Sequence, residues 1–147
     1  MIPRHALTLL VLASFAAAAC GDAADTPTSP SIPEMSVDRT SRLFSGTLPP
    51  RGSTFYSFTV AQDSGVFLTL ASLTPTSGRG TIDTAIDLGL GTPRGTGCAV
   101  AQTVAATADL AAQISAWRGA GVHCVSVSDP GRLAGTVAFA VRIGYFE

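Results

Sequence analysis

Few side chains of this sequence could support catalysis. His123 stands directly before Cys124, and because neighbouring residues of a strand point to opposite faces, the two do not form a Cys-His dyad. A Ser-His-Asp triad needs a histidine within reach of a serine, and the sequence has no Gly-x-Ser-x-Gly turn. The other histidine, His5, lies in a segment that we expect to be removed. We therefore predict that the protein is not an enzyme and that His123 is a structural residue.

The carboxylates do not form a recognisable catalytic pair or metal site. Asp83 and Asp87 are expected to lie on one face of a strand, four residues and ~13 Å apart, which is too far to share a proton or an ion. Asp63, Asp109 and Asp129 fall in expected loops and are the candidates for a calcium ion between loops. They lack a dense Asp-x-Asp run, and the sequence has no Cys-x-x-Cys motif. We predict no metal and no cofactor, with calcium as the alternative.

Trp117 is the only tryptophan, and Arg118 and a Gly-Ala-Gly turn follow it. A tryptophan at the end of a strand can stack on a sugar ring or anchor a protein partner. The alternative is a core residue, which is the more frequent role of this residue type. Tyr145 and Phe146 could join Trp117 if the two segments lie close together. Trp117 is therefore the candidate ligand contact of the sequence.

The first residues resemble the export signal of a bacterial lipoprotein. Arg4 precedes an uncharged apolar run over residues 6–19, which is shorter than the ~20 residues that a membrane-spanning helix needs. The run ends in Ala17, Ala18 and Ala19 directly before Cys20, an arrangement similar to a lipobox, although Ala17 stands where leucine is usual. The resemblance implies cleavage after residue 19 and attachment of diacylglycerol to Cys20. The alternative is an ordinary secretory signal with an Ala-x-Ala site.

The rest of the chain is expected to form a linker and one domain. Residues 20–40 are rich in Pro, Ser, Thr, Asp and Ala, a composition typical of a flexible tether, and residues 41–147 hold the folded domain. If Cys20 is lipidated, Cys98 and Cys124 remain. Because exported proteins fold in an oxidising compartment, we expect these two to form a disulfide. Two reduced, buried cysteines are the alternative.

Short apolar stretches separated by Gly, Pro, Asp and Ser predict antiparallel strands in a sandwich or barrel. Alternation predicts strands at residues 54–60, 81–90, 122–128 and 136–145, and residues 66–73 are apolar on both faces, as in a strand that is covered on both sides. Residues 99–117 are ambiguous, since they are rich in alanine and Leu110, Ile114 and Trp117 share helical spacing.

Residues 43–146 resemble the bacterial pre-peptidase C-terminal domain family. The resembling segments are residues 44–48, 53–60, 65–70, the Gly-x-Cys motif at Cys98, residues 120–129 and residues 137–141, with His123 where relatives commonly have tyrosine. The resemblance implies a jelly-roll-like antiparallel β-sandwich, and it favours a strand at residues 113–117. Domains of this family are generally non-catalytic appendages of secreted enzymes, whereas this chain carries no enzyme sequence.

The formal charge of −1, without any lysine, gives no basic stripe for nucleic acid. We predict a protein exported to the bacterial cell envelope and anchored in a membrane by the lipid on Cys20. Its domain is expected to be a non-catalytic binding or interaction module for an envelope protein or polysaccharide. The alternative function is a carbohydrate-binding module that reads glycan with Trp117.

Overall fold

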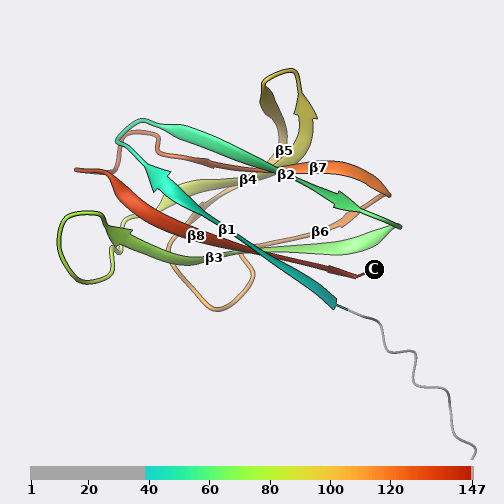
Figure 1. The fold of residues 1–147 in the computed structure, drawn as a ribbon, viewed down its shortest axis with the longest axis horizontal. Helices are drawn as coiled ribbons and strands as arrows, with labels where there is room; N and C mark the ends of the chain where they lie inside the picture. Colours follow the sequence, from blue (N-terminus) through green and yellow to red (C-terminus); the bar gives the residue numbers. More distant parts are fainter. Residues whose placement is uncertain (1–38, 147) are drawn as a thin grey trace, which may run out of the picture. The chain divides into compact units, whose positions relative to one another are not determined.

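The computed structural model describes residues 39–146, which form two four-stranded antiparallel sheets packed face to face (Figure 1). The first sheet has the order β1 (Arg39–Leu48), β8 (Val137–Phe146), β3 (Ser64–Pro75) and β6 (Ile114–Arg118). The second has the order β2 (Ser53–Val60), β7 (Gly121–Ser128), β4 (Ile86–Arg94) and β5 (Gly97–Ala106). The described residues contain no helix. The predicted all-β, jelly-roll-like sandwich is confirmed.

The predicted signal segment at residues 1–19, Cys20 and most of the predicted linker lie outside the described residues. The first strand, β1, begins at Arg39.

The core lies between the sheets, where alternate residues of each strand meet. Strand β8 is the clearest case, because every second side chain of the strand is at most 2% exposed. These side chains are those of Val137, Phe139, Val141, Ile143 and Tyr145. They pack against the inward residues of β4, which are Ile86, Leu88 and Leu90. Full burial of such a side chain stabilises the fold by roughly 1.5–3 kcal/mol. Because these alternate residues are held in the core, the residues between them face outward.

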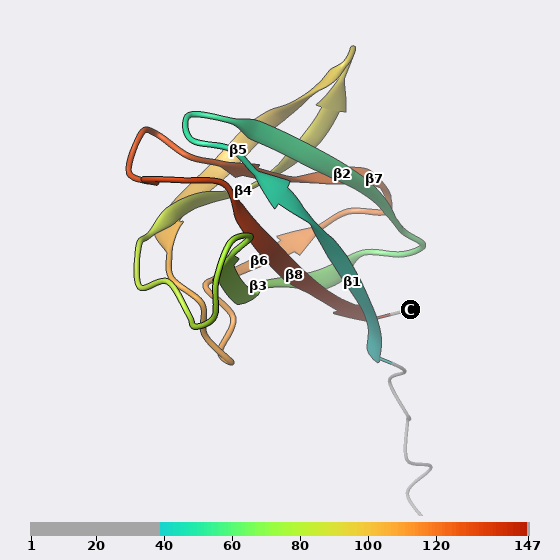
Figure 2. The ribbon, with the colours of Figure 1, turned by 60° about the vertical axis from the view of Figure 1, so that its left-hand side comes forward.

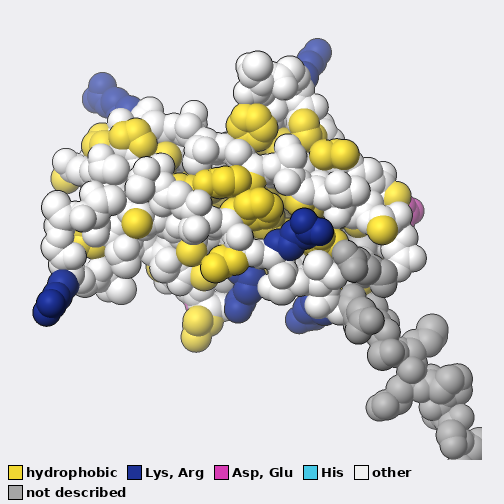
Figure 3. Space-filling view, in the orientation of Figure 1, with side chains coloured by type: hydrophobic (Ala, Val, Ile, Leu, Met, Phe, Trp, Pro, Cys, Tyr) yellow, Lys and Arg dark blue, Asp and Glu magenta, His cyan; other side chains and the backbone are white. Residues whose placement is uncertain are grey.

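The sandwich is closed at one edge by aromatic rings. Phe44 of β1 and Tyr56 of β2 stack with ring centroids 4.8 Å apart, and the Tyr56 hydroxyl donates a hydrogen bond to the Ser45 carbonyl at 3.0 Å. Figure 3 shows hydrophobic side chains in the space between β1 and β2. This contact joins the outermost strands of the two sheets.

Two expectations about β3 and β4 have different outcomes. The predicted cover on both faces of β3 is found at Thr69, which is 3% exposed, but not at Phe67, which lies on the same outer face and is partly exposed. The predicted strand at residues 81–90 is wrong over its first half, because β4 begins only at Ile86. Residues 81–85 run back past the end of β3 instead, and the Ile82 N–H donates a hydrogen bond to the Leu73 carbonyl at 3.1 Å.

The alanine-rich segment is not a helix. Residues 97–106 form β5 and pair with β4 along its length, and residues 114–118 form β6, which confirms the strand favoured by the family resemblance. Between them, the Asp109 carboxylate accepts hydrogen bonds from the N–H groups of Leu110 and Ala111, at 2.6 and 3.1 Å. Pairing with β4 outweighs the helix propensity of alanine here.

The β4–β5 hairpin stands out from the second sheet (Figures 1 and 2). The predicted disulfide between Cys98 and Cys124 is confirmed, and it ties the hairpin to β7 with a Cα–Cα distance of 5.8 Å. The backbone of β5 passes close over Gly91 of β4: a Cβ at this position would collide with the Ala99 carbonyl and lie 2.8 Å from the Val100 Cα. Gly91 therefore permits the hairpin to bend where the register of β4 and β5 shifts.

We predict that Gly91→Ala destabilises the protein by about 1–3 kcal/mol, because the added methyl group overpacks the bend. The matched control is Gly97→Ala, whose Cβ would have only one neighbour within 4 Å, the Arg94 carbonyl at 3.8 Å. Urea unfolding of both variants measures the difference. Equal free energies of unfolding for the two variants would contradict the role given to Gly91.

Candidate functional site

Trp117 lies on the outer face of the first sheet. It pairs with Gly65 of β3, while the neighbouring pair of Ala116 and Val66 points into the core. The Trp117 side chain is 70% exposed. The core alternative for Trp117 is therefore wrong, and the residue is available to a ligand.

Gly65 lies between two aromatic residues of the neighbouring strands. Trp117 lies on one side of it in β6, and Phe146 lies on the other side in β8, where the Phe146 N–H donates a hydrogen bond to the Ser64 hydroxyl at 2.8 Å. A Cβ on Gly65 would lie 3.3 Å from the Phe67 ring and 3.9 Å from the Phe146 ring. The rings of Phe67 and Phe146 therefore lie close over the Gly65 backbone, and a side chain at this position would press on the Phe67 ring.

Arg39 completes the aromatic row. Its guanidinium lies 5.6 Å from the ring centroid of Phe67 and 5.2 Å from that of Phe146, while the two rings meet edge to face at 6.1 Å. Both distances fall within the range of cation–π attraction. Arg39 pairs with Phe146 in the β1–β8 ladder, so the row runs across the whole sheet as Trp117, Gly65, Phe146 and Arg39. Tyr145, the other aromatic residue proposed to join Trp117, is fully buried in the core.

A hollow of about 590 Å³ adjoins this row. Phe67 forms one wall, and Arg142 lies at the other side, where its Nη2 donates a hydrogen bond to the Leu110 carbonyl at 2.8 Å. Its other lining residues are small, hydroxyl-bearing or apolar, with no acidic side chain among them: Ser41, Thr69, Leu110, Ala112, Ser115 and Gly144, in addition to Arg39. We call the row and the hollow together the aromatic face. It combines stacking surfaces, cations and hydroxyl groups, which suits it to binding.

The histidine and cysteine considered for catalysis are structural. His123 is 7% exposed and packs on Phe58, with ring centroids 5.9 Å apart. Its Nε2 lies 2.8 Å from the Gly119 carbonyl, and its Nδ1 is buried with no hydrogen-bond partner among the described residues. Cys124 is fully buried in the disulfide and carries no thiol.

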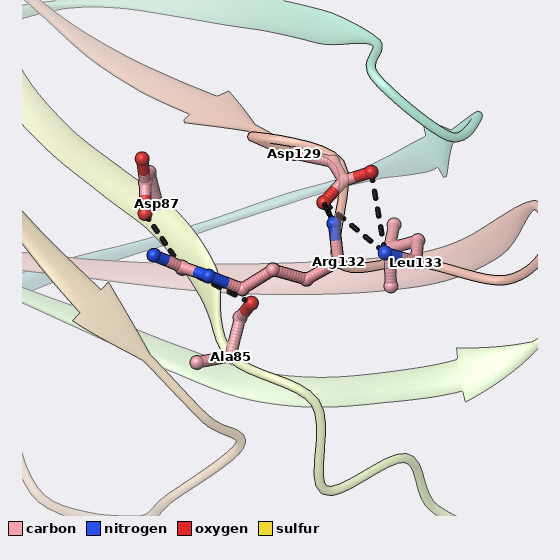
Figure 4. A network of polar contacts seen from close by, with 5 residues as sticks. All are labelled: Ala85, Asp87, Asp129, Arg132 and Leu133. Carbon is pink, nitrogen blue, oxygen red and sulfur yellow. Dashed lines mark hydrogen bonds and ion pairs between the residues drawn. The ribbon is translucent and has the colours of Figure 1, made fainter.

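The candidate calcium ligands accept hydrogen bonds from backbone N–H groups of the protein instead. Asp63 accepts a hydrogen bond from the Ala120 N–H at 2.9 Å, and Asp109 caps the turn before β6. Asp129 accepts hydrogen bonds from the N–H groups of Arg51 at 2.8 Å and of Arg132 at 2.7 Å, and Figure 4 shows the second of these. Within residues 39–146, no group of three or more His, Cys, Asp or Glu residues could hold a metal ion.

The two carboxylates of the predicted strand face have separate surroundings. Asp87 pairs with the Arg132 guanidinium at 3.0 Å, in the same network (Figure 4). Asp83 is exposed in the loop before β4. The two do not act as a pair, as the sequence indicated.

The surroundings of Asp129 shift its pKa. Burial raises the pKa of this carboxyl, but backbone hydrogen bonds from Arg51, Arg132, Gly131 and Leu133 outweigh burial, so the pKa lies below its usual value. The carboxylate holds the β7–β8 loop against the turn at Arg51.

Sequence reasoning found Trp117 and named Phe146, but it missed Phe67, Arg39 and Arg142. Alternation in the β3 segment places Phe67 opposite the buried Val66 and Leu68, and alternation in β8 places Arg142 outward in the same way. What the sequence did not contain was the order of strands, which puts β6, β3, β8 and β1 side by side.

The described part of the chain contains no helix that is long and apolar enough to cross a membrane.

No family model matches the sequence, and no curated protein matches it. The resemblance to pre-peptidase C-terminal domains therefore stays a prediction. Among solved structures, the chain is similar to PliG from Salmonella Typhimurium, a periplasmic lysozyme inhibitor of g-type lysozyme. Their identity is 15%, the match covers 71% of this chain and 90% of PliG, and the TM-score is 0.43. A match at this level assigns neither a family nor a function to the chain.

We predict that Asp129→Asn lowers the thermal unfolding temperature at pH 7, because the ionised carboxylate is what the backbone N–H groups stabilise. A carboxyl whose folded-state pKa lies below the unfolded value of about 3.9 contributes stability above that pH and loses it as the pH falls through the folded-state pKa. The difference between wild type and variant should therefore shrink below about pH 4. Asp83→Asn is the control. A difference that stays constant from pH 7 to pH 2 would contradict this explanation.

Proposed function

We propose that this protein is a non-catalytic binding module of the bacterial cell envelope and that the aromatic face of its β1–β8–β3–β6 sheet is the binding surface. The observation that carries the proposal is the 70% exposure of Trp117, which shares its outward face with Phe67, Phe146 and Arg39.

Exposure of Trp117 to water is energetically unfavourable in the isolated domain, and it favours the binding of a partner that covers the side chain. A large aromatic side chain in water forgoes the free energy of burial, and such residues, together with arginine, dominate the energy of many binding surfaces. The exposed Leu43 and Leu110 also lie on this side of the molecule, since Leu43 pairs with the outward Arg142 and Leu110 lines the hollow. A partner that covers the face would remove this apolar surface from water.

A polysaccharide fits the face better than a protein partner does. The C–H face of a sugar ring stacks on an aromatic ring, and the Trp117 side chain, which is 70% exposed, offers such a surface. The hydroxyl groups of Ser41, Thr69 and Ser115 line the neighbouring hollow and can exchange hydrogen bonds with sugar hydroxyls. The alternative function given by the sequence, a carbohydrate-binding module that uses Trp117, is therefore the form of binding that we favour.

We further propose that diacylglycerol on Cys20 anchors the domain. Support comes from the sequence: the apolar run over residues 6–19, the alanines before Cys20 and the composition of residues 20–40. More than one acyl chain gives durable attachment to a membrane. The linker would then separate the domain from the lipid surface, so that the aromatic face could reach envelope polymers.

We predict that Trp117→Ala weakens the binding of a polysaccharide ligand by about tenfold or more, because the stacking surface is lost. Unfolding free energy should change by less than about 0.5 kcal/mol, since the side chain is mostly in water. The purified protein would be screened against envelope and plant polysaccharides by affinity electrophoresis and calorimetry. The matched control is Val122→Ala, which removes another exposed apolar side chain (51% exposed) from the other sheet. Glycan binding that survives Trp117→Ala would overturn the proposal, as would a folded protein that binds no glycan.

We predict that Cys20→Ser moves the exported protein from the membrane fraction to the soluble envelope fraction, because the thiol that carries the lipid is gone. Mass spectrometry of the wild-type N-terminal peptide should show diacylglycerol on Cys20. Cys98→Ser, which removes a cysteine from the folded domain, should leave the protein in the membrane fraction. An unmodified wild-type N-terminus in the soluble fraction would instead indicate an ordinary secretory signal.

A further inference from the structure

We infer that the aromatic face recognises an acidic polysaccharide, with the carboxylates of uronate sugars bound by Arg39 and Arg142. This inference rests on the proposed function and names the chemical class of its ligand. It is carried by two guanidinium groups that line the same hollow, in which none of the described lining residues has an acidic side chain.

The Arg39 guanidinium is oriented by aromatic rings and is available to an anion. The guanidinium lies over the rings of Phe67 and Phe146 and makes no hydrogen bond with another described residue. The rings restrict the guanidinium before a ligand arrives, which lowers the entropy lost on binding. The planar fork of arginine donors matches a carboxylate in a bidentate contact.

Arg142 supplies a second cation to the same hollow. One hydrogen bond from its Nη2 to the Leu110 carbonyl fixes the side chain beneath the loop before β6 and leaves its other donors. The carboxylate of that loop, Asp109, caps its own turn, and the ion pair of Arg132 with Asp87 involves the other sheet. Among the described residues, those that line the hollow of the aromatic face carry two cations and no acidic side chain, which favours an anionic ligand.

A uronate sugar matches each group that the face presents. Its ring can stack on Phe67 or Trp117, its carboxylate can accept hydrogen bonds from arginine, and its hydroxyls can bond to Ser41, Thr69 or Ser115. An acidic peptide would satisfy the arginines but would leave the aromatic row without a matched surface. A polymer that repeats the carboxylate could contact both arginines, since both line one hollow.

The test compares polymers that separate the contribution of charge from that of the sugar ring. Polygalacturonate and alginate are the acidic probes, fully methyl-esterified polygalacturonate is the neutral probe with the same backbone, and poly-glutamate is the acidic probe without sugar. We expect the purified protein to bind at least one uronate polymer at least about tenfold more tightly than the methyl ester and than poly-glutamate, because a charge-assisted hydrogen bond is lost in the first case and stacking in the second.

Three variants assign the effect to the arginines. Arg39→Gln and Arg142→Gln should each lower affinity for the acidic polymer about tenfold and leave the weak binding of the methyl ester unchanged. Arg94→Gln, which removes an exposed cation from the β4–β5 hairpin of the other sheet, should change neither. Thermal unfolding of each variant confirms that the fold is kept, and for Arg142, which also holds the loop, Arg142→Lys should restore part of the affinity.

Each negative result shows whether this inference alone or the proposed function as well is wrong. Equal binding of the acidic polymer and its methyl ester, lost in Trp117→Ala, would overturn the acidic ligand and keep the proposed function. If poly-glutamate binds as tightly as the uronate polymers, charge alone accounts for the attraction, and the inference that a sugar is recognised is overturned. The absence of binding to either uronate polymer, with binding to neutral glycans, would overturn this inference alone, whereas a folded protein that binds no glycan would overturn the proposed function as well.

Discussion

Burial of alternate residues in β3 and β8 fixes the direction of every side chain on the outer face of the first sheet. Leu68 and Ile143 pair with each other and are both fully buried, so their neighbours Phe67 and Gly144 must point outward together. A shift of the register by one residue would turn Phe67 and Phe146 into the core and expose the buried set. The free energy of the core therefore holds the aromatic face in place, although none of its residues belongs to the core.

Glycines shape the two sheets in different ways. At Gly91 the missing side chain lets β5 pass close to β4, so the hairpin bends and the disulfide of Cys98 and Cys124 can tie it to β7. At Gly65 the missing side chain lets the rings of Phe67 and Phe146 lie close over the strand. One glycine allows close packing of backbone, and the other allows close packing of aromatic side chains on the outer face of the first sheet.

Much of the fold could be predicted from local pattern, because alternation in β2, β7 and β8 reflects burial on one face. The pattern failed at residues 81–85, where Ile82 and Thr84 continue the alternation of β4 although their backbone returns along the end of β3. The local pattern also could not decide between helix and strand for the alanine-rich segment, since the pairing of this segment with β4 is a contact between strands. Trp117 was recognisable as a candidate from its residue type. Its companions Arg39, Phe67 and Arg142 come from three other strands, and only the strand order β1-β8-β3-β6 brings them to one surface.

We propose that the protein meets its ligand on the outer face of the β1–β8–β3–β6 sheet. The most direct measurement is a two-dimensional NMR titration of isotope-labelled protein with uronate oligosaccharides, following backbone amides, the Trp117 indole and the arginine side chains. We predict saturable chemical-shift changes that concentrate on Trp117, Gly65, Phe67, Arg39 and Arg142. The amide resonances of the β4–β5 hairpin should not shift. Shifts that instead concentrate on the hairpin and the outer face of β2 and β7 would contradict the claim.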